Sequence, residues 1–341
     1  MTFWSRKILL AAVFVVLFSS CIGAPGPQST RQSVDQLSVT QSSAPSPQSL
    51  VTKSFTPQSL TPLSLTPLSL TPLSPITSPL SPSSPAPSPR SPVTKTPTPL
   101  SPCFKNSGEI VLHELESALL PKPMPFRVYL PPCYDRETEI SYPVLYLIHG
   151  QSYNDDQWDR LGADEAADRL ISRGETPPFL IVMPRDRELN TQPDTNMFGE
   201  SVVTELVPWI DEHYRTLPER EYRAVGGLSR GGGWALHIAL KDWQHFGALG
   251  THSLAIFWDD TYHIKRWLSE IPQDQMPRIY MDIGHRDRSS LMESNIWFED
   301  LLTQRGIPHE WHLFTGYHEE KYWQEHVEEY LRWYTEAWPL P

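Results

Sequence analysis

Ser229 lies in a glycine-rich segment whose spacing could support nucleophilic catalysis. With Gly227 and Gly231 it forms a G-x-S-x-G pattern between a predicted strand over 222–228 and a predicted helix over 232–240. On a sharp strand-to-helix turn a serine takes a strained backbone conformation, and bulky neighbours would clash there. The start of the helix supplies unpaired N–H groups near the hydroxyl. An ordinary glycine-rich turn is the alternative, and the flanking elements favour a nucleophile.

A serine hydroxyl at neutral pH needs a base to accept its proton and an acid to orient that base. In this arrangement both follow the serine, just beyond the carboxyl ends of later strands. Asp287, after a predicted strand over 278–283, is the candidate acid, and His318, after a predicted strand over 309–314, is the candidate base. Asp282 competes with Asp287 but lies within its strand. The other role for Asp287 is a surface ion pair with its flanking arginines.

The same chemistry needs two backbone N–H groups to bind an oxyanion. Arg230, directly after the serine, is expected to supply one of them. The second is expected from the loop after a predicted strand over 143–148. Gln151 is the candidate there, because Gly150 lets the backbone approach a substrate closely.

The remaining pattern of residues 103–341 predicts the elements that position these groups. Apolar or alternating runs predict strands over 109–114, 126–130, 143–148, 179–183, 222–228, 246–252, 278–283 and 309–314. Helical spacing predicts helices over 161–173, 201–214, 232–240, 261–269, 291–304 and 320–338. This order predicts an α/β fold with a mostly parallel sheet and helices on both faces. Only about one helix fits between Ser253 and Pro277, so we expect no large lid domain.

Several stretches of residues 103–341 resemble a known family. They are Tyr129–Pro132, Tyr142–Gly150, Gly227–Gly232, Gly284–Asp287 and Gly316–His318. Together they resemble the putative-esterase family of α/β-hydrolases, which includes feruloyl esterases, S-formylglutathione hydrolases and mycolyltransferases. The resemblance implies the α/β-hydrolase fold, with Ser229 as nucleophile, Asp287 as acid, His318 as base, and Gln151 and Arg230 at the oxyanion positions.

The sequence departs from the family pattern at two positions. Arg230 stands where Met is commoner, and Tyr317 stands where a small residue precedes the histidine. Both departures bear on the acyl or alcohol pocket. Trp158 occupies a position where the family often has Trp. Trp258 is the tryptophan best placed to line a cleft, although we expect a core position for it.

The predicted function is that of a serine carboxylic-ester hydrolase that acts outside the cytoplasm, with acylated glycans as candidate substrates. An acyltransferase of the mycolyltransferase type would use the same triad, and a non-catalytic surface-binding module would share only the fold. No cofactor or metal is expected. Gly231-Gly232-Gly233 lacks dinucleotide-binding spacing, and His309 and His312 would face opposite sides of a strand.

The charge distribution excludes one class of partner. The chain has a net charge of −12, and residues 1–102 contain six basic residues and one acidic residue. Residues 103–341 therefore carry −17. Such a region repels phosphate backbones, so we expect no nucleic-acid partner and interpret the acidity as a source of solubility.

The first residues predict export. Arg6 and Lys7 precede an apolar run over 8–18, which is shorter than the roughly 20 residues that span a bilayer. Cys21 follows small residues as in a lipobox, although Phe18 replaces the usual Leu. Residues 1–21 therefore predict a signal peptide with lipidation at Cys21 and anchoring to the outer face of the cytoplasmic membrane. An ordinary cleaved signal is the alternative, but no A-x-A site follows.

Residues 22–102 are rich in Pro, Ser and Thr, and Ser-Leu-Thr-Pro-Leu occurs three times in succession from Ser59. Frequent prolines block helix and sheet pairing, so we expect a disordered linker that reaches up to about 250 Å. The esterase domain is expected over 103–341. Outside the cytoplasm its two cysteines, Cys103 and Cys133, can form a disulfide, and two buried thiols are the alternative.

Overall fold

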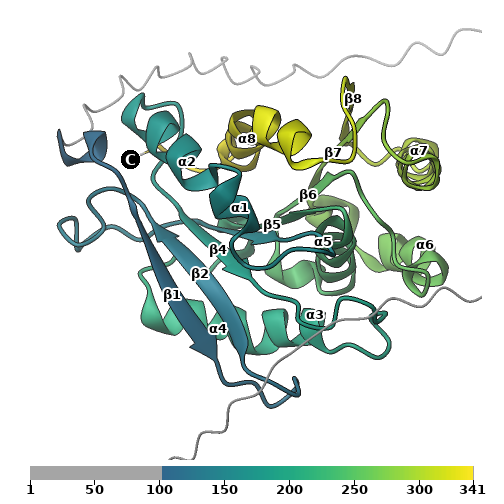
Figure 1. Cartoon of the computed structure of the whole chain (residues 1–341), viewed down its shortest axis with the longest axis horizontal. Helices are drawn as coiled ribbons and strands as arrows, with labels where there is room; N and C mark the ends of the chain where they lie inside the picture. The colour runs from purple at the N-terminus through teal and green to yellow at the C-terminus, as the bar shows by residue number, and fades with distance from the viewer. Residues whose placement is uncertain (1–101, 341) are drawn as a thin grey trace, which may run out of the picture. The chain divides into compact units, whose positions relative to one another are not determined.

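The computed structural model describes residues 102–340 (Figure 1). The predicted signal peptide over 1–21, the lipidation of Cys21 and nearly all of the linker over 22–102 lie outside the described residues. These remain predictions. Among the described helices, none combines the length and apolar content that crossing a bilayer requires.

An eight-stranded sheet forms the centre of the described region. Its strands are β1 (Glu109–Leu115), β2 (Met124–Leu130), β3 (Val144–Ile148), β4 (Leu180–Pro184), β5 (Arg223–Leu228), β6 (Ala248–His252), β7 (Arg278–Gly284) and β8 (Glu310–Phe314). Their order is β1-β2-β4-β3-β5-β6-β7-β8. β2 pairs antiparallel with β1 and β4, and all other neighbours are parallel. The predicted mostly parallel sheet is confirmed.

Helices cover both faces of this sheet (Figure 1). They are α1 (Gln157–Arg160), α2 (Ala163–Ser172), α3 (Phe198–Ser201), α4 (Val207–His213), α5 (Arg230–Lys241), α6 (Asp260–Glu270), α7 (Ser289–Gln304) and α8 (Glu320–Thr335). One apolar core includes residues from α3 to α7, and the other includes residues from α1, α2 and α8. Because both faces are covered, β3, β4, β5 and β6 are buried along their whole length.

The single helix predicted over 201–214 is interrupted. A π-helical turn, Val202–Leu206, lies between α3 and α4. Pro208 lies in the first turn of α4, and proline has no N–H to donate to the preceding turn. A wider turn before it relieves this loss. The periodicity therefore predicted the apolar face correctly but not the local hydrogen bonding.

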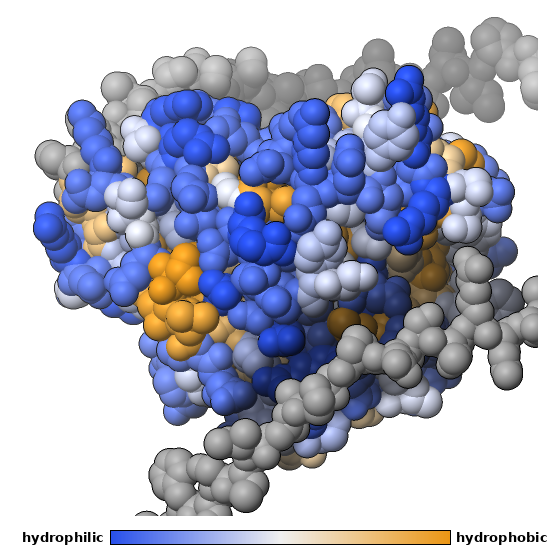
Figure 2. Space-filling model, in the orientation of Figure 1, coloured by the Kyte–Doolittle hydropathy of each residue, from blue (hydrophilic) through white to orange (hydrophobic). Residues whose placement is uncertain are grey.

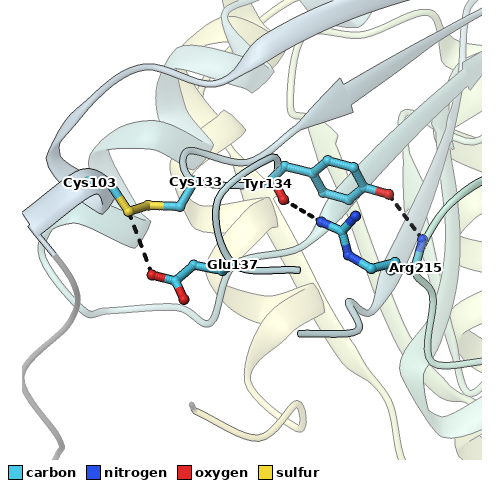
Figure 3. The surroundings of a disulfide bond; sticks show 5 residues. All are labelled: Cys103, Cys133, Tyr134, Glu137 and Arg215. Carbon is cyan, nitrogen blue, oxygen red and sulfur yellow. Dashed lines mark hydrogen bonds between the residues drawn. A yellow bond between two sulfur atoms is a disulfide. The ribbon is translucent and has the colours of Figure 1, made fainter. Parts of the chain in front are cut away.

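The predicted disulfide joins Cys103 to Cys133, with a Cα–Cα distance of 5.6 Å (Figure 3). It ties the short 3₁₀ turn at Pro102–Lys105 to the segment after β2. Beside it, the Arg215 N–H donates to the Tyr134 hydroxyl at 3.0 Å, and the Arg215 guanidinium donates to the Tyr134 carbonyl (Figure 3). The start of the segment after β2 is thus fixed to the rest of the domain at two consecutive residues, Cys133 and Tyr134.

The surface seen in Figure 2 is mostly hydrophilic, and its most extensive apolar patch lies over β1 and β2. Leu112 on β1 is 66% exposed and belongs to this edge of the sheet. The opposite edge strand, β8, is also only partly covered.

Candidate active site

Ser229 occupies a strained turn between β5 and α5. Its φ of 54° and ψ of −119° are unfavourable for a residue with a side chain. The turn is tight, because a Cβ on Gly231 would lie 2.1 Å from the Ile148 carbonyl oxygen. The Ser229 N–H donates to the His252 carbonyl at 2.8 Å, and the Ser229 carbonyl accepts the Ala255 N–H at 3.1 Å. Hydrogen bonds to β6 and to the loop that follows it therefore hold the strained conformation.

The three predicted side chains meet at this turn. His318 Nε2 lies 2.9 Å from Ser229 Oγ, and His318 Nδ1 lies 3.0 Å from Asp287 Oδ2. The Asp287 side chain is fully buried and that of His318 is 11% exposed. With Nδ1–H donating to the carboxylate, Nε2 is free to accept the serine proton. A fully buried carboxylate also does not fit the surface ion pair considered for Asp287.

Asp282, the rival acid, belongs to a second histidine–aspartate pair. Its Oδ1 lies 2.6 Å from His252 Nδ1, and its Oδ2 accepts hydrogen bonds from the Tyr330 hydroxyl at 2.9 Å and from the Tyr322 hydroxyl. Both members of the pair are inaccessible to solvent. Sequence reasoning placed Asp282 inside its strand but missed His252. Only the β6–β7 register, in which His252 faces Asp282, would have indicated the pair.

Buried hydrogen bonds fix the loop that carries Gln151. His149 Nε2 accepts the Asp186 N–H at 3.0 Å, and His149 Nδ1 donates to the Gly150 carbonyl at 2.8 Å. Burial lowers the pKa of His149, which keeps the imidazole in the neutral form that these bonds require. The Gly150 N–H donates to Gln157 Oε1 at 2.8 Å. Gln151 thus follows a backbone segment that is held by the loop after β4, by Gln157 of α1 and by the side chain of His149.

The Arg230 side chain forms a buried ion pair. Its Nη2 lies 3.0 Å from Asp186 Oδ2, and the two side chains are 7% and 2% exposed. Trp234 Nε1 donates to the same carboxylate at 2.9 Å. The Arg230 N–H is the first of α5, so it has no acceptor within the helix. The Arg230 side chain, which stands where Met is commoner, therefore binds the loop after β4, while its backbone N–H has no helical acceptor beside Ser229.

Three other aromatic positions differ in their surroundings. Tyr317 is 50% exposed, and its hydroxyl accepts a hydrogen bond from Arg286 Nη1 at 3.0 Å. Trp158 is buried and donates to the Ile148 carbonyl at 3.0 Å. Trp258 was expected in the core, but it is 68% exposed, and this prediction was wrong. Its position beyond the end of β6 places it on the surface.

Comparison with known proteins shows which proteins this chain resembles. The family model described as "Putative esterase" matches residues 117–334. Esterase Rv1288 of Mycobacterium tuberculosis is 27% identical over 242 residues, which cover 56% of this chain and 51% of that protein. An endo-1,4-beta-xylanase/feruloyl esterase of Xylanibacter ruminicola is 34% identical over 133 residues, which cover 36% of this chain and 18% of that protein.

A solved ferulic acid esterase superimposes with a TM-score of 0.60 at 26% identity, covering 68% of this chain and 99% of that chain. The feruloyl esterase module from Clostridium thermocellum, complexed with sinapinate, gives a TM-score of 0.58 at 16% identity and shows the fold alone. The chain spans about half the length (51%) of the mycobacterial relative. Since the family model covers more than half of the sequence and the fold agrees, the chain belongs to the Putative esterase family of α/β-hydrolases.

Proposed function

We propose that the protein is a serine carboxylic-ester hydrolase, and the observation that carries this proposal is the hydrogen-bonded series Ser229–His318–Asp287. Ser229 Oγ attacks the ester carbonyl carbon while His318 Nε2 takes the hydroxyl proton. Asp287 stabilises the resulting imidazolium. The N–H groups of Arg230 and Gln151 bind the tetrahedral oxyanion.

The second half of the reaction uses the same groups. His318 donates its proton to the departing alkoxide, so an alcohol leaves and an acyl-serine remains. A water molecule then transfers a proton to His318 and attacks the acyl carbon. Collapse of the second tetrahedral intermediate releases a carboxylic acid and restores the Ser229 hydroxyl.

We propose acylated glycans as the substrate class. Two relatives carry the name feruloyl or ferulic acid esterase, and one of them is also named a xylanase. The segment between β6 and β7 contains α6 and one short 3₁₀ turn, which is too little to form a lid domain. The predicted export signal and the Cys103–Cys133 disulfide support action outside the cytoplasm.

The test combines active-site labelling with kinetics. A fluorophosphonate probe should label the wild-type protein, and Ser229→Ala should abolish labelling and lower p-nitrophenyl acetate turnover by about 10⁴–10⁶-fold. Ser172→Ala, on α2, is the matched control and should behave as wild type. A wild-type protein that neither reacts with the probe nor hydrolyses esters would refute the proposal and leave the non-catalytic binding module. Formation of acylated sugar in the presence of sugar acceptors would instead identify an acyltransferase.

A further inference from the structure

An exposed groove between α6 and α7 is rich in aromatic side chains. Trp258 and Tyr262 are each 68% exposed, and their rings meet edge to face with centroids 5.9 Å apart. Trp297 and Ile256 also line the groove, which has a volume of about 710 Å³. Figure 1 shows α6 and α7 at the same side of the molecule. Because the large rings of Trp258 and Tyr262 are both exposed to solvent on neighbouring turns, we interpret them as part of a binding surface and not as packing residues.

The segment that carries Trp258 is hydrogen-bonded to the backbone of Ser229. The Ala255 N–H donates to the Ser229 carbonyl at 3.1 Å, and Ala255 precedes Trp258 by three residues. Even fully extended, three residues span only about 11 Å. Asn295 Nδ2 donates to the Leu254 carbonyl at 2.8 Å, and the Trp258 N–H donates to Gln192 Oε1 at 2.9 Å. This segment is therefore held at both ends, and the backbone of Trp258 lies within about 11 Å of the residue that bonds to the Ser229 carbonyl.

The chemistry of the groove fits a neutral saccharide chain. The electron-rich faces of exposed aromatic rings attract the weakly positive C–H groups of a sugar ring. Polar groups of Thr261, Ser290, Lys265 and Glu293 also line the groove and can bond to sugar hydroxyls. One cation and one anion leave the lining without net charge, and the acidic domain as a whole disfavours an anionic chain.

We propose that this aromatic groove is a subsite for the saccharide part of the ester substrate. The inference rests on the proposed function, because it assigns the alcohol side of the ester to a glycan. It places the sugar chain over Trp258 and Tyr262 while the ester carbonyl lies at Ser229.

Binding without turnover tests the subsite independently of catalysis. The full-length Ser229→Ala protein is run in native gels that contain soluble, unesterified arabinoxylan. Adding Trp258→Ala should weaken retardation, with an apparent Kd raised about 3- to 10-fold, the range expected for one lost aromatic contact. Adding Tyr262→Ala as well should weaken it further. Leu112→Ala, equally exposed on β1, is the matched control and should leave retardation unchanged.

Kinetics separate this inference from the proposed function. For otherwise wild-type protein, Trp258→Ala should lower the ratio of kcat/KM on feruloylated arabinoxylan oligosaccharides to kcat/KM on methyl ferulate by about 3- to 10-fold, through KM. Equal loss on both esters, or no arabinoxylan retardation of the Ser229→Ala protein, would overturn the subsite while leaving the esterase intact. Absence of hydrolysis of every ester would instead refute the proposed function.

Discussion

Replacing Arg230 with Met tests how much the buried ion pair beside Ser229 contributes to the stability of this domain. The Arg230 guanidinium contacts Asp186 Oδ2 through Nε at 3.1 Å and through Nη2 at 3.0 Å. It also donates to the Glu188 carbonyl at 3.1 Å and lies 4.9 Å from the centre of the Phe257 ring. Met fills a similar volume but leaves the Asp186 carboxylate buried without its cation.

The expected loss follows from that uncompensated charge. Removing one partner of a buried pair typically costs about 3–5 kcal/mol in free energy of unfolding. For a domain of this size each kcal/mol lowers Tm by about 2–4 °C, so Arg230→Met should lower Tm by about 6–20 °C. Trp234 and Asn196 still donate to Asp186, which favours the lower half of this range.

The assay is thermal and urea unfolding, with p-nitrophenyl acetate hydrolysis measured under conditions where the variant is folded. In the proposed mechanism Arg230 acts through its backbone N–H, which the substitution leaves in place. We therefore expect kcat to fall less than about tenfold, against 10²–10³-fold for a lost oxyanion donor. Adding Asp186→Asn should recover part of the stability, with a coupling energy above about 1 kcal/mol. A Tm of Arg230→Met within 2 °C or so of wild type would refute this account of the pair.

Three further predictions concern stability. Burial and the neighbouring Glu165 raise the pKa of Asp164 to about 7. Ionised Asp164 therefore lowers the free energy of unfolding. This loss is absent below about pH 4, grows between about pH 4 and pH 7, and is constant at higher pH. In urea unfolding, Asp164→Asn should therefore stabilise the protein by on the order of 1 kcal/mol at pH 8, allowing for solvent screening, and should have no such effect at pH 4. An equal stabilisation at pH 8 and pH 4 would contradict the raised pKa of Asp164. Replacing both Cys103 and Cys133 by Ser should reduce the unfolding free energy by about 3–4 kcal/mol, and wild type measured in reductant should match the double variant. Gly231→Ala places a methyl group 2.1 Å from the Ile148 carbonyl and should destabilise the domain by about 2 kcal/mol or more; a Tm equal to wild type would show that the turn relaxes freely.

Much of the fold follows from local patterns in the sequence. Each predicted strand is present within two residues of its expected ends. The buried parallel strands leave continuous apolar runs, and the exposed edge strand β1 leaves an alternating pattern. The positions of Asp287 and His318 could be predicted because both follow the carboxyl end of a strand. The chain order Ser, Asp, His then limits the candidate acid and base to residues that follow Ser229.

What the sequence could not provide was the contacts between distant segments. The His252–Asp282 and Arg230–Asp186 pairs depend on strand register and on the path of the loop after β4. Neither leaves a spacing signal. Trp258 was misplaced for a related reason, because an aromatic residue in a loop indicates burial only on average.

The tyrosines of α8 make the last helix part of the structure that supports the Ser229 turn. The Tyr334 hydroxyl lies 3.0 Å from His252 Nε2, and a Cβ on either Gly226 or Gly250 would overlap it. Shortening α8 would remove hydrogen-bond partners from the buried side chains of His252 and Asp282. The carbonyl of His252 accepts the Ser229 N–H, so the loss would reach the Ser229 turn. A C-terminal truncation should therefore not extend as far as Tyr334, although Ser229 lies more than a hundred residues upstream.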